Sequence, residues 1–439
     1  GGEARTDDAR AEREAATRRG DFPPPRGDER VVVDGLLGTG ATGAPRGWAA
    51  EGIAAVEQAR AGGPLVAALD VPSGLDATTG AAPGPVATAD LTLTFGTLKR
   101  GLLVAREHAG AIALLDIGLE PFLDAPAATL LTRPAVPDIP AAAHKGSRRK
   151  LAVLGGAAGM AGAAILAGRA ALRSGIGMVR LVVAPASLPV VQGAVPEALA
   201  SPWPEDEAAL ADLARWADAW LVGPGLGVSP TTRALVERLL AATAATAAPV
   251  VLDADALNVF AGEAAALGER LGGRAALVTP HPLEFARLSG RALDAVLADR
   301  FEGGAALART LGAAVLLKGV PTVVHAPSER SHVVAAGTPA LAVGGSGDVL
   351  GGIAATLLAQ LVDAEGPAGA ELGEMAAIAG ASAAWVHGRA AERATAVRAL
   401  VRGVTLAEVL DALPGAWHDA ACPRAARTPV LVELPAVPG

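Results

Sequence analysis

Short apolar runs alternate with longer amphipathic stretches along most of the chain, and this alternation predicts its secondary structure. In the first third we expect strands at "RVVVDG", "PLVAALDV", "ADLTLTFG" and "GAIALLDIGL", with a helix at "GWAAEGIAAVEQARAGG" after the first of them. Strands that alternate with helices are typical of a parallel α/β sheet. The pattern therefore predicts one such domain over residues 31–135.

A second and longer α/β pattern begins at "RRKLAVLGG". A helix at "AGAAILAGRAALRSG" follows, and further strands are expected at "MVRLVVA", "AWLVGPGLG", "APVVLDADAL", "AALVTPHPLEF" and "AAVLLKGVPTVVHA". This predicts a second parallel-sheet domain over residues 140–415, with a Pro- and Ala-rich linker at about 120–145 before it. Residues 416–439 are expected to form a tail. Residues 1–30 are charged and form either one short exposed helix or a disordered segment.

Composition narrows the function classes. The chain has 439 residues, of which 51% are hydrophobic, and a formal net charge of -8, which argues against a nucleic-acid partner or a membrane surface. No apolar run is long enough to span a membrane. The single cysteine, Cys422, excludes a disulfide framework and fits a reducing compartment. We expect a cytoplasmic protein, and a homo-oligomer.

Polar residues follow several of the predicted strands in the second domain. In open parallel sheets, the carboxyl ends of the strands form the edge where ligands bind. Asp253 and Asp255 either hold Mg²⁺ through water or cap the next helix. His281, fixed between two prolines and followed by Glu284, is either structural or a ligand-binding residue. Lys318 is either solvated or meets a phosphate.

The segment "LAVGGSGDVLGGI" at 341–353 places four glycines around Ser346 and Asp348 at the start of a predicted helix. One interpretation is a loop with glycines at positive φ and a polar N-cap. The other is an anion site, in which backbone N–H groups converge on a phosphate at the positive end of the helix and the acid acts on a substrate hydroxyl.

Two glycine-rich motifs in the first domain are less specific. "GTGATG" at 38–43 fits the dinucleotide pattern GxGxxG, but no acid lies about 20 residues further on to bind a ribose. "LDVPSGLDATTG" brings Asp70, Ser73 and Asp76 into one turn, which is typical of an Asx or ST turn. The chain contains no GxxxxGK[ST] motif of a P-loop nucleotidase.

Taken together and in this order, "GPGLG", "DADALN", "TPHPLEFARL", "LLKGVPTVV" and "GTPALAVGGSGDVLGGI" resemble the ADP/ATP-dependent NAD(P)H-hydrate dehydratases. "VVVDGLLGTG", "LDVPSGLDATTG" and "ADLTLTFGTLKRGL" resemble the NAD(P)H-hydrate epimerase domain. The tandem is similar to the bifunctional NAD(P)H-hydrate repair enzymes. The resemblance implies a ribokinase-like parallel-sheet domain preceded by a shortened, Rossmann-like α/β epimerase domain.

For the second domain, the resemblance implies dehydration of the S epimer of NADH hydrate or NADPH hydrate, with ADP or ATP as co-substrate and Mg²⁺. Asp348 would be the general base on the hydroxyl of the hydrated ring. The hydrate would be contacted by Ala163, Gly227, His281 and Asp348. The nucleotide would be bound by Lys318, Gly319, Val320, Pro321, Thr322, Gly345, Ser346 and Gly347.

For the first domain, the resemblance implies that Asp34 is the catalytic acid/base of the epimerase. Asp34 and Ser73 would also hold a potassium ion. The hydrate would be contacted by Gly38, Thr39, Gly40, Ala41, Thr42, Gly43, Ala44 and Asp70. The family carries an early "GNNGGDG"-type loop, whereas this chain begins "GGEARTDDAR". We therefore expect a folded epimerase-like domain with little or no epimerase activity.

Two other functions stay open at this point. A ribokinase-like vitamin or sugar kinase would share the glycine–aspartate motif and the nucleotide. A regulatory module would bind the nucleotide without turnover. The ordered motifs and the epimerase-like domain disfavour the first, and Asp348 disfavours the second.

Overall fold

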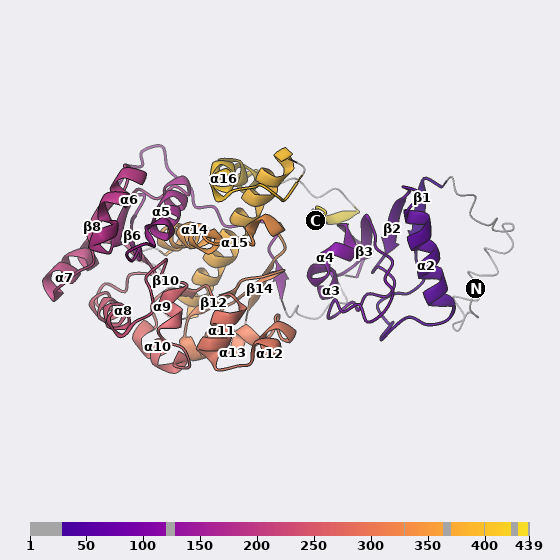
Figure 1. Cartoon of the computed structure of the whole chain (residues 1–439), viewed down its shortest axis with the longest axis horizontal. Helices are drawn as coiled ribbons and strands as arrows, with labels where there is room; N and C mark the ends of the chain where they lie inside the picture. The colour runs from indigo at the N-terminus through magenta and orange to yellow at the C-terminus, as the bar shows by residue number, and fades with distance from the viewer. Residues whose placement is uncertain are drawn as a thin grey trace. The chain divides into compact units, whose positions relative to one another are not determined.

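The computed structural model describes residues 29–119, 128–328, 330–362, 370–398, 400–422 and 429–437 (Figure 1). The chain divides into two compact units. Unit 1 comprises residues 1–123 and 425–437, and unit 2 comprises residues 124–424. The segment expected as a charged terminus lies, apart from its last two residues, outside the described residues.

Unit 1 is built on a five-stranded sheet in the order β1-β2-β3-β4-β15. Its first four strands pair in parallel, and β15 pairs antiparallel with β4. One side of α2 packs on the sheet, because Ile53 and Val56 are spaced three residues apart and are both buried. The elements are β1 (Val31–Asp34), α2 (Trp48–Arg60), β2 (Leu65–Leu69), β3 (Leu91–Phe95), α3 (Arg100–Val104), α4 (Arg106–Ala109), β4 (Ala111–Leu115) and β15 (Val430–Leu434).

Unit 2 is built on a ten-stranded sheet in the order β5-β14-β13-β12-β11-β10-β9-β6-β7-β8. Every described pairing in this sheet is parallel except those of β13 with β12 and β14. The strands are β5 (Thr129–Leu130), β6 (Lys150–Leu154), β7 (Met178–Val183), β8 (Leu199–Pro202), β9 (Ala219–Val222), β10 (Val250–Leu252), β11 (Ala276–Val278), β12 (Ala314–Leu317), β13 (Thr322–His325) and β14 (Ser331–Val334).

Helices cover both faces of this sheet (Figure 1). Neighbouring strand residues point to opposite faces, so Leu221 joins the core under α5, α14, α15 and α16, and Trp220 joins the core under α8, α10 and α13. The helices are α5 (Ala161–Arg173), α6 (Leu188–Ala194), α7 (Glu207–Trp216), α8 (Pro230–Ala242), α9 (Asp255–Asn258), α10 (Ala264–Leu271), α11 (Pro282–Ser289), α12 (Leu293–Ala298), α13 (Gly303–Leu311), α14 (Ser346–Leu361), α15 (Ala370–Arg398) and α16 (Leu406–Ala421).

The α/β fold expected from the sequence is confirmed, with differences in detail. The run "AAVLLKGVPTVVHA", expected as one strand, is the antiparallel pair β12 and β13, because the chain turns at Lys318–Pro321. The sheet of unit 2 is therefore mixed rather than purely parallel. The expected tail contains β15, which joins the sheet of unit 1, and β5 at 129–130 joins the sheet of unit 2. None of the helices described is long and apolar enough to cross a membrane.

Candidate active site

The carboxyl ends of β9, β10, β11 and β12 meet at one edge of the sheet of unit 2, because these strands are parallel neighbours. The residues that follow them are the "GPGLG" turn, Asp253, the His281 segment and Lys318. The first turn of α14 lies against Asp253 and Lys318. Asp253 and Lys318 thus stand together where the sequence predicted a ligand site.

Lys318 and Asp253 form an ion pair at the centre of this edge. The Lys318 Nζ lies 2.6 Å from the Asp253 Oδ1, and the Asp253 side chain is only 2% exposed. Gly347 at the start of α14 is close to both, since a Cβ there would lie 3.1 Å from the Lys318 Nζ and 3.5 Å from the Asp253 Oδ2. Only a residue without a side chain leaves the ammonium group undisturbed.

Asp348 lies in the first turn of α14, beside this ion pair. The pKa of the Asp348 carboxyl is raised from 3.8 to about 7, chiefly by burial; the negative charges of Asp253 and Asp255 contribute to the rise and the Lys318 ammonium opposes it. A carboxyl with a pKa near neutrality can accept a proton at physiological pH and release it again. Asp348 therefore has the properties of a general base.

Acidic side chains outnumber the lysine in this site. Burial alone would lower the pKa of Lys318, but the charges of Asp253, Glu284 and Asp348 reverse this effect and raise it. Burial raises the pKa of Glu284, whose carboxyl lies close enough to Lys318 and Asp253 to respond to both charges. Lys318 is thus held protonated and can attract phosphate oxygens.

His281 is placed by its own helix. Its Nδ1 accepts hydrogen bonds from the N–H groups of Leu283 and Glu284 at 3.1 and 3.2 Å, and the Glu284 Oε2 accepts from the His281 N–H at 2.9 Å. This reciprocal capping box begins α11. The imidazole is 47% exposed, and its Nε2 lies 3.4 Å from the Glu284 Oε1.

The remaining residues predicted to contact the hydrate are packed around the "GPGLG" turn. The Gly227 N–H donates to the Asp255 Oδ2 at 2.7 Å. Asp255 lies in the first turn of α9, a helix that no side chain caps. Ala163, in the first turn of α5, lies beside the turn, because its Cβ is 3.0 Å from where a Cβ of Gly225 would stand.

The predicted nucleotide residues form two neighbouring segments. Lys318, Gly319, Val320, Pro321 and Thr322 make the turn between β12 and β13, where Val320 is 62% exposed. The second segment is the start of α14. The Ser346 N–H donates to the Val343 O at 3.3 Å, while the amides of Gly345 and Gly347 have no backbone acceptor among the described residues. Such free N–H groups at a helix start are suited to an anion.

In unit 1, Asp34 is completely buried at the end of β1. Its Oδ2 accepts from the Ser73 N–H at 2.7 Å, and its Oδ1 accepts from the Ser73 hydroxyl at 2.6 Å and from the Leu36 N–H at 3.3 Å. The Ser73 Oγ also accepts from the Leu37 N–H at 2.9 Å. The two residues expected to hold potassium are therefore engaged with each other and with backbone.

The other unit 1 residues predicted to contact the hydrate lie at the same sheet edge. Asp70, at a φ of 68°, follows β2 and forms an ion pair with Lys99. Its Oδ1 also accepts from the Phe95 N–H at 3.2 Å. Gly38, Thr39, Gly40, Ala41, Thr42, Gly43 and Ala44 form a largely exposed loop, and a side chain at any of its three glycines would meet nothing within 4 Å. The loop stands open beside β1.

Neither unit shows a ready metal site. No group of three or more histidine, cysteine, aspartate or glutamate side chains in the described ranges is spaced to hold an ion. The carboxylates of Asp253 and Asp255 are already bonded to Lys318 and to the Gly227 N–H. The residues present do not form a protein cage for Mg²⁺, and the closed Asp34–Ser73 pair offers little to potassium.

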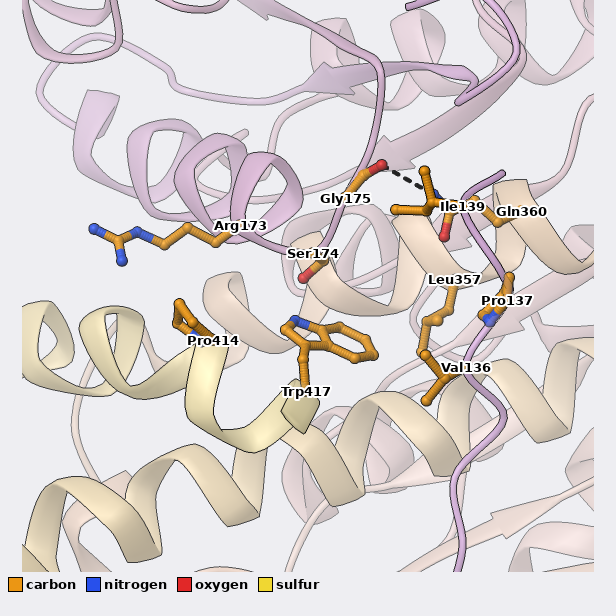
Figure 2. Close-up of a pocket in the computed structure, with 10 residues that line it drawn as sticks. All are labelled: Val136, Pro137, Ile139, Arg173, Ser174, Gly175, Leu357, Gln360, Pro414 and Trp417. Carbon is orange, nitrogen blue, oxygen red and sulfur yellow. Dashed lines mark hydrogen bonds between the residues drawn. The ribbon is translucent and has the colours of Figure 1, made fainter. Parts of the chain in front are cut away.

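A separate cavity of about 300 Å³ lies in unit 2 (Figure 2). It is lined by the ends of α5 and α14, by α16 and by residues 136–139. Leu357 and Gln360 reach it from the last turns of α14, so at 1.5 Å per residue it is about 14 to 18 Å along that helix from Asp348. The cavity is separate from the site and mostly apolar.

A family model gives the geometry an independent context. The model described as NAD(P)H-hydrate dehydratase matches residues 151–415, which is more than half of the chain and includes the whole site of unit 2. The chain belongs to the NAD(P)H-hydrate dehydratase family. A second model, described as YjeF-related protein N-terminus, matches residues 2–101.

Relatives of this dehydratase family member carry both parts. The chain is 36% identical over 340 residues to the bifunctional NAD(P)H-hydrate repair enzyme Nnr of Escherichia coli, covering 75% of this chain and 63% of that one. It is 36% identical over 389 residues to the Coxiella burnetii enzyme of the same name, covering 85% and 73%. The chain thus spans less than two thirds of the Escherichia coli relative.

Solved structures of the family agree with the fold. The ADP/ATP-dependent NAD(P)H-hydrate dehydratase of Bacillus subtilis, co-crystallised with ATP and Mg²⁺, matches with a TM-score of 0.54 and 27% identity, covering 66% of this chain and 99% of that one. A ribokinase-like superfamily protein from Enterococcus faecalis matches with a TM-score of 0.55 and 23% identity, covering 69% and 99%. The ribokinase-like fold expected for the second domain is confirmed.

Sequence reasoning missed one residue that the structure brings to this site. Arg300 lies two residues after the end of α12. Its Nη1 donates to the Lys318 O at 3.2 Å and to the Pro321 O at 3.3 Å, so it stabilises the predicted nucleotide turn. Arg300 lies in a polar stretch between two short helices, far from any glycine motif. No sequence signal of the kind used above would have selected it.

Proposed function

We propose that this chain dehydrates the S epimer of NADH hydrate or NADPH hydrate, with ADP or ATP as co-substrate. The observation that carries the proposal is Asp348: it lies in the first turn of α14 beside backbone N–H groups that have no acceptor among the described residues, and its pKa is raised to about 7, chiefly by burial. A base and an anion site thus stand side by side, as transfer of a phosphoryl group to a hydroxyl requires.

The proposed reaction begins at the hydroxyl on the hydrated nicotinamide ring. Hydroxide is a poor leaving group, so the terminal phosphoryl group of the nucleotide is transferred to that oxygen while the Asp348 carboxylate accepts its proton. Phosphate then departs with the C–O bond electrons, and loss of a ring proton restores the double bond. The products are NAD(P)H, phosphate and a nucleotide shortened by one phosphate.

The other residues of the site act on charge and position. The amides of Gly345 and Gly347 face the transferring phosphoryl group at the positive end of α14. Lys318 exchanges part of its contact with Asp253 for the phosphate oxygens. Ala163, Gly227 and His281 border the space for the hydrate. Mg²⁺ would enter with the phosphates of the nucleotide, and we assign it no protein ligand.

A direct assay tests this proposal. Purified hydrated NADH is mixed with the protein and ADP, and recovery of the reduced-nicotinamide absorbance is followed. We expect enzyme- and nucleotide-dependent recovery whose rate rises with pH through about 7, because Asp348 must be deprotonated to act. No recovery at any pH would refute the proposal.

The same assay separates the alternatives. A vitamin or sugar kinase would consume the nucleotide with another alcohol and leave the hydrate unchanged. A regulatory module would bind the nucleotide and consume neither. The match of residues 151–415 to the dehydratase model and the 27% identity to the Bacillus subtilis dehydratase favour the hydrate over other alcohols.

A further inference from the structure

Arg300 is a half-buried cation without a countercharge. Burial lowers the pKa of its guanidinium group, and among the described residues no carboxylate forms an ion pair with it. Its neighbour Asp299 is paired with Arg291 at 2.8 Å. Partial removal of a charge from water is costly when no opposite charge lies beside it, so the position of Arg300 needs an explanation.

Arg274 shows what a purely structural buried arginine looks like in the same unit. Its Nε, Nη1 and Nη2 donate to the Leu271 O, the Thr243 Oγ1 and the Leu240 O. All three nitrogen atoms are therefore engaged, and the residue joins the end of α10 to the end of α8. In Arg300 only the Nη1 makes hydrogen bonds in the described structure, both of them long, and its Nη2 and Nε remain available.

The guanidinium lies against the turn between β12 and β13, and its Nη1, which donates to the Lys318 O and the Pro321 O, is the atom nearest to Gly319. At Gly319, whose φ is 149°, an added Cβ would come within 2.1 Å of the Arg300 Nη1 and 2.7 Å of the Nη2. The glycine thus admits the guanidinium to the turn. On the other side of the same turn, the Lys318 Nζ faces the start of α14. One cation, Lys318, therefore begins the turn of five residues, and the other, Arg300, packs against it.

We propose that Arg300 binds a phosphate of the adenine nucleotide that is not transferred, an inference that rests on the proposed function. Lys318 and the start of α14 hold the terminal phosphoryl group beside Asp348. The phosphate nearer to the ribose then lies along the turn, close to Arg300, and the Arg300 Nη2 and Nε donate to the oxygens of this phosphate. The nucleotide supplies the negative charge that the protein does not.

The test is a comparison of ligands that differ only in phosphate number. Adenosine, AMP and ADP are titrated calorimetrically into the wild type, Arg300→Gln and Arg300→Lys, with exposed Arg287→Gln as a control for the loss of one positive charge. A charge-assisted hydrogen bond contributes about 1.5–3 kcal/mol, which predicts that Arg300→Gln weakens AMP and ADP about 10- to 100-fold. Adenosine affinity should be unchanged, and Arg300→Lys should be intermediate.

Steady-state kinetics give a second readout. We expect Arg300→Gln to raise the KM for ADP while kcat at saturating ADP stays close to that of the wild type, because Arg300 does not contact the transferred group. If Arg300 only supports the turn, the affinities for AMP, ADP and adenosine will fall by the same factor, or kcat will fall while KM rises. Either result overturns the inference. A wild type that binds no adenine nucleotide would overturn the proposed function itself.

Discussion

Each unit places an aspartate at the carboxyl edge of its sheet, the fully buried Asp34 and the half-buried Asp348, but the two carboxylates have opposite surroundings. Asp34 is enclosed by donors, since both of its oxygens accept hydrogen bonds from Ser73 or from backbone N–H groups. Asp348 is surrounded by other carboxylates, with Lys318 as the opposing charge, and its pKa is raised to about 7. Burial is the main cause of the raised pKa of Asp348 and the nearby carboxylates add to it, whereas both oxygens of Asp34 are held by hydrogen-bond donors.

The largest effect is expected from removing the proposed proton acceptor of unit 2, Asp348. Asp348→Asn has nearly the same shape but cannot accept a proton, so we expect the dehydration rate to fall about 10²- to 10⁴-fold. Nucleotide affinity, measured by calorimetry, should change little. Turnover near that of the wild type would show that another group is the base.

The aspartate of unit 1 gives the complementary test. With both oxygens of Asp34 occupied and the loop at 38–44 open, a hydrate would be poorly positioned, which can cost about 10² or more in rate. We therefore expect little or no enzyme-dependent conversion of the pure R epimer, after correction for spontaneous conversion. Rapid conversion that is lost in Asp34→Asn would contradict this.

The environment of Lys318 can be altered through Gly347. A branched side chain in Gly347→Val would meet the Lys318 Nζ, since even a Cβ would lie 3.1 Å from it. We expect the KM for ADP to rise about tenfold or more, as the loss of one charge-assisted contact implies. Gly347→Ala should have a smaller effect, because the end of the lysine can move by a few tenths of an ångström. Equal nucleotide kinetics in a folded Val variant would place the anion elsewhere.

The smallest expected effect is on stability and depends on pH. The pKa of Asp348 is higher in the folded state than its ordinary value of 3.8, so the folded state binds more protons between about pH 4 and 7 and loses stability as pH rises through that window. Asp348→Asn removes this loss. Its free energy of unfolding should exceed that of the wild type by about 1 kcal/mol or more at pH 8, and by little below pH 4.

Denaturant unfolding at both pH values measures this difference. Asp138→Asn, at an exposed position of the same unit, serves as the control and should show the same difference from the wild type at pH 4 and pH 8. A constant offset for Asp348→Asn at both pH values would contradict the raised pKa.

The sequence predicted most of the strands and the edge where the site lies, because parallel strands place their carboxyl ends together whatever their order. Asp253, Lys318 and Asp348 accordingly stand side by side. Two interpretations of single residues stayed open until the contacts were known. His281 caps α11 through its Nδ1 while its side chain stays about half exposed, and Asp255 accepts from the Gly227 N–H.

What the sequence did not predict depends on contacts between distant segments. Strand β13 continues an apolar run, and only the turn at Lys318–Pro321 shows that the chain reverses. One interpretation placed the glycines around Ser346 at positive φ. This is true of Gly345, at 91°, but not of Gly347, where the Lys318 Nζ lies close to the position of a Cβ. Arg300 has no motif at all, since its role is defined by two carbonyl groups of another segment.

Strand β15 has a consequence for how the chain reaches its native state. It pairs with β4, although the whole of unit 2 lies between them in the sequence. During synthesis, the N-terminal sheet must therefore wait with one edge uncovered until the ribosome has produced all of unit 2. An uncovered strand edge is a template for pairing with other chains. The risk of aggregation is thus greatest in nascent and truncated chains. Rapid folding of unit 2 would shorten the time during which the edge at β4 stays uncovered.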